Sequence, residues 1–379
     1  GELRHLRSVL GSMSTGEAST RGWDRLEQTE WPFFALVFYA DAATRIARLP
    51  LAPSRREAVV AEARWALERA HAVGITGAEP VLPHGHLLLA LTRFAREGRA
   101  SEYRELRDHL ADDLGRRFSA SESGMLPSYP SMWWTLDPVP ALAALALRGE
   151  GAQARERWEA TVRASAIDPA TGLVIAGWNP ERGRAIGTPR GCALMLALPD
   201  LYLVSPRLAR EQWSLARRHL VRTVEGVTGI REYPEPIDLP PTTDSGRIVF
   251  GLGEAASGFG LAAAAAAEDR IVLAALLRSA RRVAPPTWRG EELYLPGVPV
   301  VGQAALLRAK VWDAAALRAG PHAHTMAKPT FITHAVGGGS PGRYLRQSAS
   351  PASDSNEPNP HRFVRTAMSS VPGALRLRT

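Results

Sequence analysis

The sequence contains a single cysteine, Cys192, among its 379 residues. One cysteine cannot form an internal disulfide and gives no thiolate cluster for a metal ion. The sequence also lacks an apolar run long enough to span a bilayer, and no signal-peptide pattern opens it. We therefore expect no membrane span in this chain and favour the cytoplasm. The chain begins with Gly1 and not Met, which leaves an upstream anchor open.

Lysine is almost as scarce, because Lys310 and Lys328 are the only two. Arginine supplies the rest of the basic residues, and the net charge is +8. More than half of this excess lies from Pro321 onward, where seven basic residues stand against two acidic ones. The remaining chain carries little net charge, so we expect no nucleic-acid partner. Residues 321–379 are rich in Gly, Ser, Pro and Asn and lack hydrophobic periodicity, which predicts a disordered tail.

Apolar segments that each open with a proline are abundant. Proline suits the first turn of a helix, because its φ is fixed near the helical value and its missing N–H would have no partner there. A helix that is apolar on most sides is buried. Six buried helices are therefore expected, at intervals of 51 to 58 residues. They start at Pro32, Pro83, Pro138, Pro189, Pro241 and Pro299.

Amphipathic stretches rich in Arg and Glu alternate with these buried segments, and they predict outer helices. They cover residues 54–74, 101–118, 152–166 and 206–224. A period near 50 residues indicates a repeat architecture. We expect an all-α fold, an α/α six-fold barrel or toroid of six inner and about six outer helices, over residues 1–320. An open α-solenoid of the TPR or HEAT type is the alternative.

In a closed toroid the six inner helices point their N-termini at one rim, where we expect the pocket. Residues that precede the inner helices or lie in their first turns combine acid/base groups with aromatic rings, a mixture typical of a small-molecule site. The candidate catalytic residues are Glu30, His84, His86, Tyr129, Asp137, Cys192 and Asp244. The candidate substrate-binding residues are Trp133, Trp134, Trp178, Arg190, Tyr233 and Arg247.

Two of these acids have a structural alternative. Asp137 directly precedes Pro138 and fits a helix N-cap. Asp244, in PPTTDSGR, could cap the fifth inner helix, with Thr243 as a rival cap. If either acid is functional, it would accept a proton or balance a developing positive charge.

The histidines and the cysteine also allow two interpretations. His84 and His86 are two residues apart and lie on different faces of a helix, so we expect no shared metal ion. Either could act as acid or base, or be a buried structural histidine. Cys192 could be a pocket thiol whose pKa is lowered by helix N-termini, or a small core residue. We expect no strand before the glycines of GLGEAASGFG, and their spacing is wrong for the fingerprint, so we expect no dinucleotide site.

Five segments between Glu30 and Trp312 together resemble the linalool dehydratase/isomerase-like family. They are EWPFFALVFYADA, SYPSMWWTLDPVPALAALAL, IDPATGLV, TDSGRIVFGLGEAASGFGLAAA and PGVPVVGQAALL. The resemblance implies an α/α six-fold barrel and cofactor-free acid/base chemistry on an isoprenoid alcohol. It also implies an acid near the first inner helix, here Glu30 or Glu27, and a histidine near the second, His84 or His86. The family's cysteines around the third helix have no counterpart in SYPSMWWTLDP.

These observations favour a cofactor-independent lyase or isomerase acting on a hydrophobic, isoprenoid-like alcohol. A histidine or tyrosine would protonate the leaving oxygen, and Asp137 or Asp244 would take a proton from carbon. A carbohydrate-active enzyme, either a glycoside hydrolase or a sugar epimerase, is the alternative on the same toroid. A non-catalytic helical binding protein is a third hypothesis. A small-molecule substrate is the expected partner, and a homo-oligomer stays open.

Overall fold

The computed structural model describes residues 1–12, 31–73, 80–129 and 132–316. The chain divides into two compact units, Gly1–Gly320 and Pro321–Thr379, and every described residue belongs to the first. The tail expected over 321–379 lies outside the described residues. So do Glu27 and Glu30, the acids assigned to the first inner helix.

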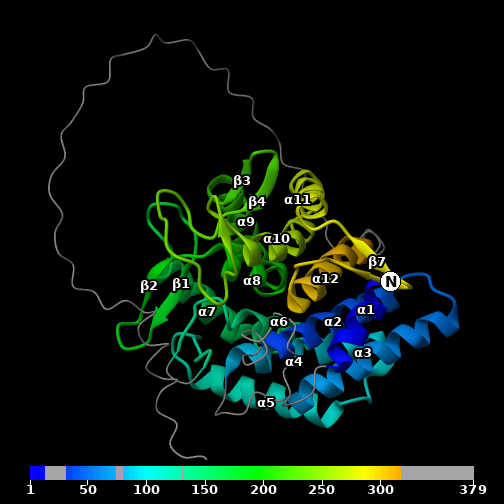
Figure 1. Cartoon of the computed structure of the whole chain (residues 1–379). Coiled ribbons are helices and arrows are strands. Elements are labelled where there is room, and N and C mark those ends of the chain that lie inside the picture. Colours follow the sequence, from blue (N-terminus) through cyan, green and yellow to red (C-terminus); the bar gives the residue numbers. More distant parts are fainter. Residues whose placement is uncertain (13–30, 74–79, 130–131, 317–379) are drawn as a thin grey trace, which may run out of the picture. The chain divides into compact units, whose positions relative to one another are not determined.

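Six helices form a closed inner ring (Figure 1). Each of them packs against the next, and the last packs against the first. An open solenoid cannot make this closing contact, so the fold is an all-α, α/α six-fold barrel. The inner helices are α2 (Trp31–Ala47), α4 (Val81–Phe94), α6 (Val139–Leu147), α8 (Gly191–Val204), α10 (Glu254–Ala266) and α12 (Val300–Ala316).

Six further helices lie outside this ring and alternate with the inner ones along the chain. They bury one stripe each. In α11, for example, the buried residues Val272, Leu276 and Ser279 are spaced as on one helix face. A short π-helical turn, η1 (Ala95–Arg99), follows α4. The outer helices are α1 (Glu2–Ser12), α3 (Pro53–Val73), α5 (Arg104–Ala120), α7 (Ala152–Ser165), α9 (Pro206–His219) and α11 (Arg270–Val283).

Five of the six inner helices begin within two residues of the proline that predicted them. The fifth prediction was wrong, because α10 begins at Glu254, well after Pro241. A hairpin of β5 (Ile248–Val249) and β6 (Leu252–Gly253) precedes it, with Phe250 and Gly251 at the turn. Their φ angles are 52° and 78°. Left-handed residues cannot continue a right-handed helix, so the apolar run splits into a hairpin and a helix.

Four antiparallel hairpins are found in the described part of the chain, and all of them lie in connections that lead from an outer helix to an inner one. The connections in the other direction are short, and Ser205 alone separates α8 from α9. The longer loops therefore gather at the rim where the inner helices start. Besides β5–β6, the hairpins are β1 (Ile175–Asn179) with β2 (Arg184–Pro189), β3 (Val221–Val224) with β4 (Val227–Ile230), and β7 (Thr287–Arg289) with β8 (Glu292–Tyr294).

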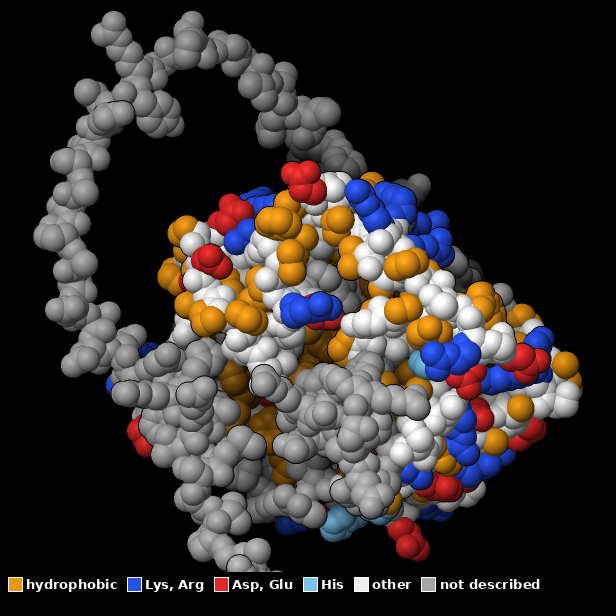
Figure 2. Space-filling model, in the orientation of Figure 1, with side chains coloured by type: hydrophobic (Ala, Val, Ile, Leu, Met, Phe, Trp, Pro, Cys, Tyr) orange, Lys and Arg blue, Asp and Glu red, His pale blue; other side chains and the backbone are white. Residues whose placement is uncertain are grey.

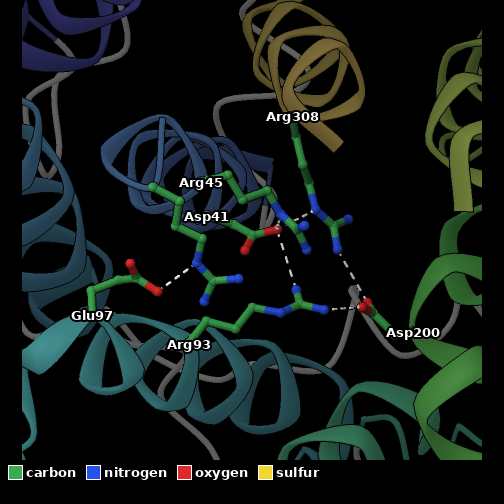
Figure 3. A network of polar contacts seen from close by, with 7 residues as sticks. Asp41, Arg45, Arg93, Glu97, Asp200 and Arg308 are labelled. Carbon is green, nitrogen blue, oxygen red and sulfur yellow. Dashed lines mark hydrogen bonds and ion pairs between the residues drawn. The ribbon is translucent and has the colours of Figure 1, made fainter. Parts of the chain in front are cut away.

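A buried network of charged side chains crosses the barrel (Figure 3). Asp41 of α2 accepts hydrogen bonds from Arg308 of α12 at 2.7 Å and from Arg93 of α4 at 3.2 Å. Asp200 of α8 accepts from the same two arginines, at 3.2 Å from Arg308 and 2.6 Å from Arg93. Arg45 completes the group through its own bond to Asp41. We call these five side chains the central network.

The central network is closed to solvent, since all five residues are less than a tenth exposed. Burial alone would raise the pKa of Asp41 and Asp200, but the arginines outweigh it and hold both pKa values below the usual range. Three cations stand against two anions. The ring of Trp312 lies 3.7 Å from the Arg45 guanidinium and faces part of this excess positive charge.

Removing one acid from the central network should destabilise the barrel strongly. The substitution Asp200→Asn leaves Arg93 and Arg308 buried with too little negative charge, so we expect a loss of about 3 to 5 kcal/mol in unfolding free energy, measured by urea denaturation. The control is Asp113→Asn on α5, whose ion pairs with Arg116 and Arg117 lie near the surface and should cost less than about 1 kcal/mol. Equal losses in the two variants would contradict this role.

Acid should weaken the barrel through the same two carboxyls. The folded-state pKa values of Asp41 and Asp200 lie below the value of 3.8 that holds for an unperturbed Asp. Their contribution to stability is therefore present above that pH and is lost as the pH falls below it. In acid titrations followed by circular dichroism, Asp200→Asn should show a smaller loss of stability than the parent. Parallel titration curves for Asp200→Asn and the parent would contradict this role of the two carboxyls.

Candidate functional site

The first turn of α8 is pinned to the segment Arg231–Tyr233. The backbone N–H of Gly191 donates to the carbonyl of Glu232 at 2.7 Å. A Cβ on Gly191 would lie 2.1 Å from the carbonyl oxygen of Arg231, so a residue with a side chain would not fit without a backbone shift. This close approach places the side chains of Glu232 and Tyr233 at the N-terminus of an inner helix, at the rim with the long loops.

Glu232 lies at the centre of the resulting cluster and is completely buried. Its carboxylate accepts hydrogen bonds from Arg190 Nε at 2.9 Å, from the backbone N–H of Cys192 at 3.1 Å and from the Cys192 thiol at 3.0 Å. It thereby satisfies a first-turn amide of α8 that has no partner within the helix. Burial raises the pKa of Glu232 despite the opposing effect of Arg190.

Arg190 joins this helix start to the loop that carries Asp244. Its Nη2 donates to Thr242 Oγ1 at 2.6 Å, and its Nη1 lies 3.5 Å from Asp244 Oδ2. The guanidinium is also 5.7 Å from the ring centre of Trp134. While Arg190 is buried, the Asp244 side chain is 48% exposed, so one carboxylate of the cluster reaches solvent.

Tyr233 contributes a hydroxyl group with an unmet hydrogen bond. The residue is 4% exposed, and its hydroxyl has no hydrogen-bond partner among the described residues. Burial raises its pKa, and the charges of Arg190, Glu232 and Asp244 also act on it, which places the hydroxyl near the cluster. A buried polar group without a partner is costly. The Tyr233 hydroxyl is therefore the unsatisfied donor of this cluster among the described residues.

The structure thus brings together five of the sequence-predicted site residues, and for two of them it excludes one of the two interpretations that the sequence left open. Burial and Glu232 raise the pKa of the Cys192 thiol well above its usual value, which excludes a pocket thiol with a lowered pKa, so the thiol keeps its proton and donates a hydrogen bond to Glu232. Asp244 does not cap the fifth inner helix, because α10 begins only at Glu254. The five residues are Trp134, Arg190, Cys192, Tyr233 and Asp244.

The structure also places the other predicted residues. Arg247 is exposed and pairs with Glu254 at 3.1 Å. Trp178 is buried in β1, where its backbone N–H donates to the carbonyl of Trp133, which is itself half-buried. His84 is half-buried in the first turn of α4, and Tyr129 and Asp137 are half-buried in the segment before α6.

His86 lies inside the barrel and not at the Arg190 cluster. Its ring packs edge-on against Phe34 and Phe38, at 5.3 and 5.9 Å between ring centres. Burial lowers its pKa to about 3, so the imidazole is neutral at pH 7. Together with Asp41 and Arg308, among others, it lines a cavity of about 10 Å³, which has room for roughly one water molecule.

Glu232 was missed by sequence reasoning, although its neighbour Tyr233 was named. In GIREYPEP the residue follows a short strand and belongs to no hydrophobic period or spaced motif. Its importance comes from Arg190 and Cys192, which lie about 40 residues earlier in the chain. The burial of a loop glutamate beside two such partners has no signal in a single sequence.

None of the helices in the described part of the chain is long and apolar enough to cross a membrane. Nor do three His, Cys, Asp or Glu side chains gather there as a metal ion would need. Figure 2 shows the face seen in Figure 1, where hydrophobic side chains line a recess in the middle.

No protein-family model matches this chain, and no curated protein is significantly similar to it in sequence. Solved structures are similar to it in fold. The Lin0763 protein from Listeria innocua has a TM-score of 0.55 at 11% identity, over 83% of this chain and 97% of that one. The GH76 α-mannanase BT2949 of Bacteroides thetaiotaomicron has a TM-score of 0.51 at 10% identity, over 84% and 97%.

A third similar structure is an inactive variant of the α-1,6-mannanase GH76A of Salegentibacter sp. HEL1_6, with two adjacent aspartates replaced by asparagine and α-1,6-mannotriose bound. Its TM-score is 0.50 at 11% identity, over 74% of this chain and 89% of that one. At identities this low, the structural similarity shows the fold alone, an α/α toroid that these proteins share with this chain.

The raised pKa of Glu232 should be visible in the pH dependence of stability. A folded-state pKa above the ordinary value of 4.5 adds stability below pH 4.5, and this contribution is lost as the pH rises through the raised value. Glu232→Gln removes this ionisation. Relative to the parent, the variant should therefore gain thermal stability as the pH rises from 4.5 toward neutrality, measured by differential scanning fluorimetry.

The matched control for this experiment is Glu211→Gln on α9. Burial there is outweighed by hydrogen bonds from Arg163 and Arg207, which lower the pKa of Glu211. Relative to the parent, that variant should lose stability as the pH rises toward 4.5 and change little above it, so its slope is opposite in sign and lies on the acid side of the Glu232 effect. If Glu232→Gln gave a pH profile parallel to that of the parent, Glu232 would be an ordinary carboxylate.

Proposed function

We propose that this chain is a carbohydrate-active enzyme that isomerises or epimerises a sugar by acid/base proton transfer. The observation that carries the proposal is the buried, unpartnered hydroxyl of Tyr233 beside Arg190 and Asp244, at the rim of an α/α toroid. The similar structures that are named mannanases support a carbohydrate as the substrate class. The polar cluster supports it independently, since charged groups suit a hydroxyl-rich ligand better than a hydrocarbon.

The proposed roles follow from exposure and contact. Asp244 reaches solvent and would take the proton from the sugar carbon next to the carbonyl group. The Tyr233 hydroxyl would donate its proton to the carbonyl oxygen and regain one from the hydroxyl on the neighbouring carbon. For isomerisation, Asp244 returns its proton to the former carbonyl carbon. No proton is gained or lost overall. Arg190 would hold Asp244 in place, and Glu232 and Cys192 position Arg190.

Glycoside hydrolysis fits this cluster less well. It needs two carboxyls about 5 to 9.5 Å apart with a glycosidic bond between them. Here the Arg190 guanidinium contacts both Glu232 and Asp244 and occupies the space between them, and Glu232 is fully buried. The adjacent aspartates of the Salegentibacter enzyme have a sequence parallel only in Asp112–Asp113, which lies on the outer helix α5.

The isoprenoid-alcohol hypothesis remains a competitor because of the sequence segments that suggested it. The Trp134 ring lies near Arg190, and apart from it and the Cys192 thiol the groups of the cluster are charged or hydroxyl-bearing. A panel of substrates should therefore contain free aldoses, α-1,6-mannotriose and isoprenoid alcohols. Proton NMR in D₂O would detect solvent deuterium entering the sugar, new reducing ends or alkene products.

Removing the Tyr233 hydroxyl should separate stability from activity. Because that hydroxyl has no protein partner, Tyr233→Phe should leave the free energy of unfolding unchanged or slightly higher, while turnover falls by about 10² or more. The control is Tyr39→Phe, whose hydroxyl donates to Glu62 at 2.8 Å. It should lose about 1 kcal/mol of stability and keep full turnover.

The products of the panel decide the reaction. Deuterium at the exchanged sugar carbon, with a new isomer, is the expected result. If α-1,6-mannotriose gave new reducing ends, the reaction would be hydrolysis and not isomerisation. If an isoprenoid alcohol gave alkenes, the lyase hypothesis would be supported instead. Sugar turnover that survives in Tyr233→Phe would remove this hydroxyl from the mechanism.

Asp244→Asn provides a second test of the site. The side chain is half exposed and 3.5 Å from Arg190, so its charge contributes little stability, less than about 1 kcal/mol. Loss of the base should still lower turnover by about 10² or more. Chemical denaturation and sugar turnover are measured together. A variant as active as the parent would exclude Asp244 as the base and pass that role to Asp137.

A further inference from the structure

The turn of the β5–β6 hairpin carries an aromatic ring in an unfavourable backbone conformation. Phe250 and Gly251 occupy the two central turn positions, with φ angles of 52° and 78°. Two-residue hairpin turns with both angles positive favour Asn-Gly, because a bulky side chain is strained there. Phe250 is also 72% exposed. Its ring therefore gains little from burial in the barrel to offset the strain.

This turn is attached directly to the candidate site. The carbonyl of Gly251 accepts a hydrogen bond from the backbone N–H of Glu232 at 3.1 Å. The Arg231 guanidinium packs so closely on Gly251 that a Cβ there would lie 2.6 Å from its Nη1. Gly253 approaches the Glu232 carboxylate, with 3.1 Å between its ideal Cβ position and Oε2. The hairpin thus holds Phe250 at a fixed place near the cluster.

Arg231 itself is held by two further contacts, which make the support of the turn rigid. Its Nε donates to the carbonyl of Tyr233 at 3.0 Å, and its Nη1 lies 3.3 Å from Glu235 Oε1. Arg231 therefore links Tyr233, whose hydroxyl has no partner among the described residues, to the turn that carries Phe250.

We infer that Phe250 is a stacking platform for a pyranose ring, one sugar unit away from the reacting one. A pyranose has an apolar face of C–H groups, and an exposed aromatic ring can pack against it. Strained residues cluster at ligand-binding sites, where the ligand contact makes use of an otherwise unfavourable conformation. The inference rests on the proposed function, because it requires a carbohydrate at the Tyr233 site.

The substitution Phe250→Asn tests the platform, because Asn suits this turn better than Phe does. Relief of the strain should raise Tm by about 1 to 3 °C. Loss of the ring should weaken binding of α-1,6-mannotriose by about fivefold or more, while binding of D-mannose stays within about twofold. Phe250→Trp keeps an aromatic ring and should retain mannotriose binding. Isothermal titration calorimetry with both sugars gives the affinities.

Glu225→Asn is the matched control, because Glu225 and Gly226 form the β3–β4 turn with φ angles of 49° and 72°. It should raise Tm similarly without changing either affinity. If Phe250→Asn binds mannotriose as tightly as the parent, the platform is excluded while the proposed function stands. If the parent binds neither sugar, the inference is overturned. Turnover in the substrate panel then decides separately whether the proposed function also fails.

Discussion

The closed ring depends on the central network of buried charges. Two aspartates and three arginines from α2, α4, α8 and α12 meet inside the barrel, so four of the six inner helices share one set of hydrogen bonds. A buried charge without a partner is costly, and each helix is therefore needed to satisfy another. Apolar packing alone would accept several registers of these helices, whereas the network fits one.

The central network lies away from the rim at which the inner helices start, since its residues stand at or beyond the middle of their helices. Its arginines are held by the two aspartates. The cavity beside it, where Asp41 Oδ1 and His86 Nε2 have no hydrogen-bond partner among the described residues, has room for about one water. The opposite end carries the hairpins and long loops, and there Arg190 and Tyr233 meet the chain segment that leads into α10. In proteins generally, loops that a rigid scaffold positions often carry the functional residues.

Much of the fold could be predicted from the sequence, because proline and apolar runs act locally. The failure at Pro241 came from Phe250 and Gly251, whose left-handed conformation is not encoded by hydrophobicity. The central network was not foreseen either, although its charges interrupt apolar segments such as FYADAATRIA and ALPDLYLV. Each charge alone fits a helix surface, and its partners are fixed only by the closed ring. Glu232 escaped notice for the same reason.

Ring closure by α12 has a consequence for how the chain folds. Arg308 reaches Asp41 across 267 residues of sequence, so the bond between the first and last inner helices is among the most distant contacts in the chain. Contacts of such separation form slowly, because the loop between them must be closed first. In a nascent chain that has not yet emerged as far as Val300, Asp41 and Asp200 lack Arg308 as a hydrogen-bond partner. We therefore expect the barrel to be completed only after synthesis has passed α12.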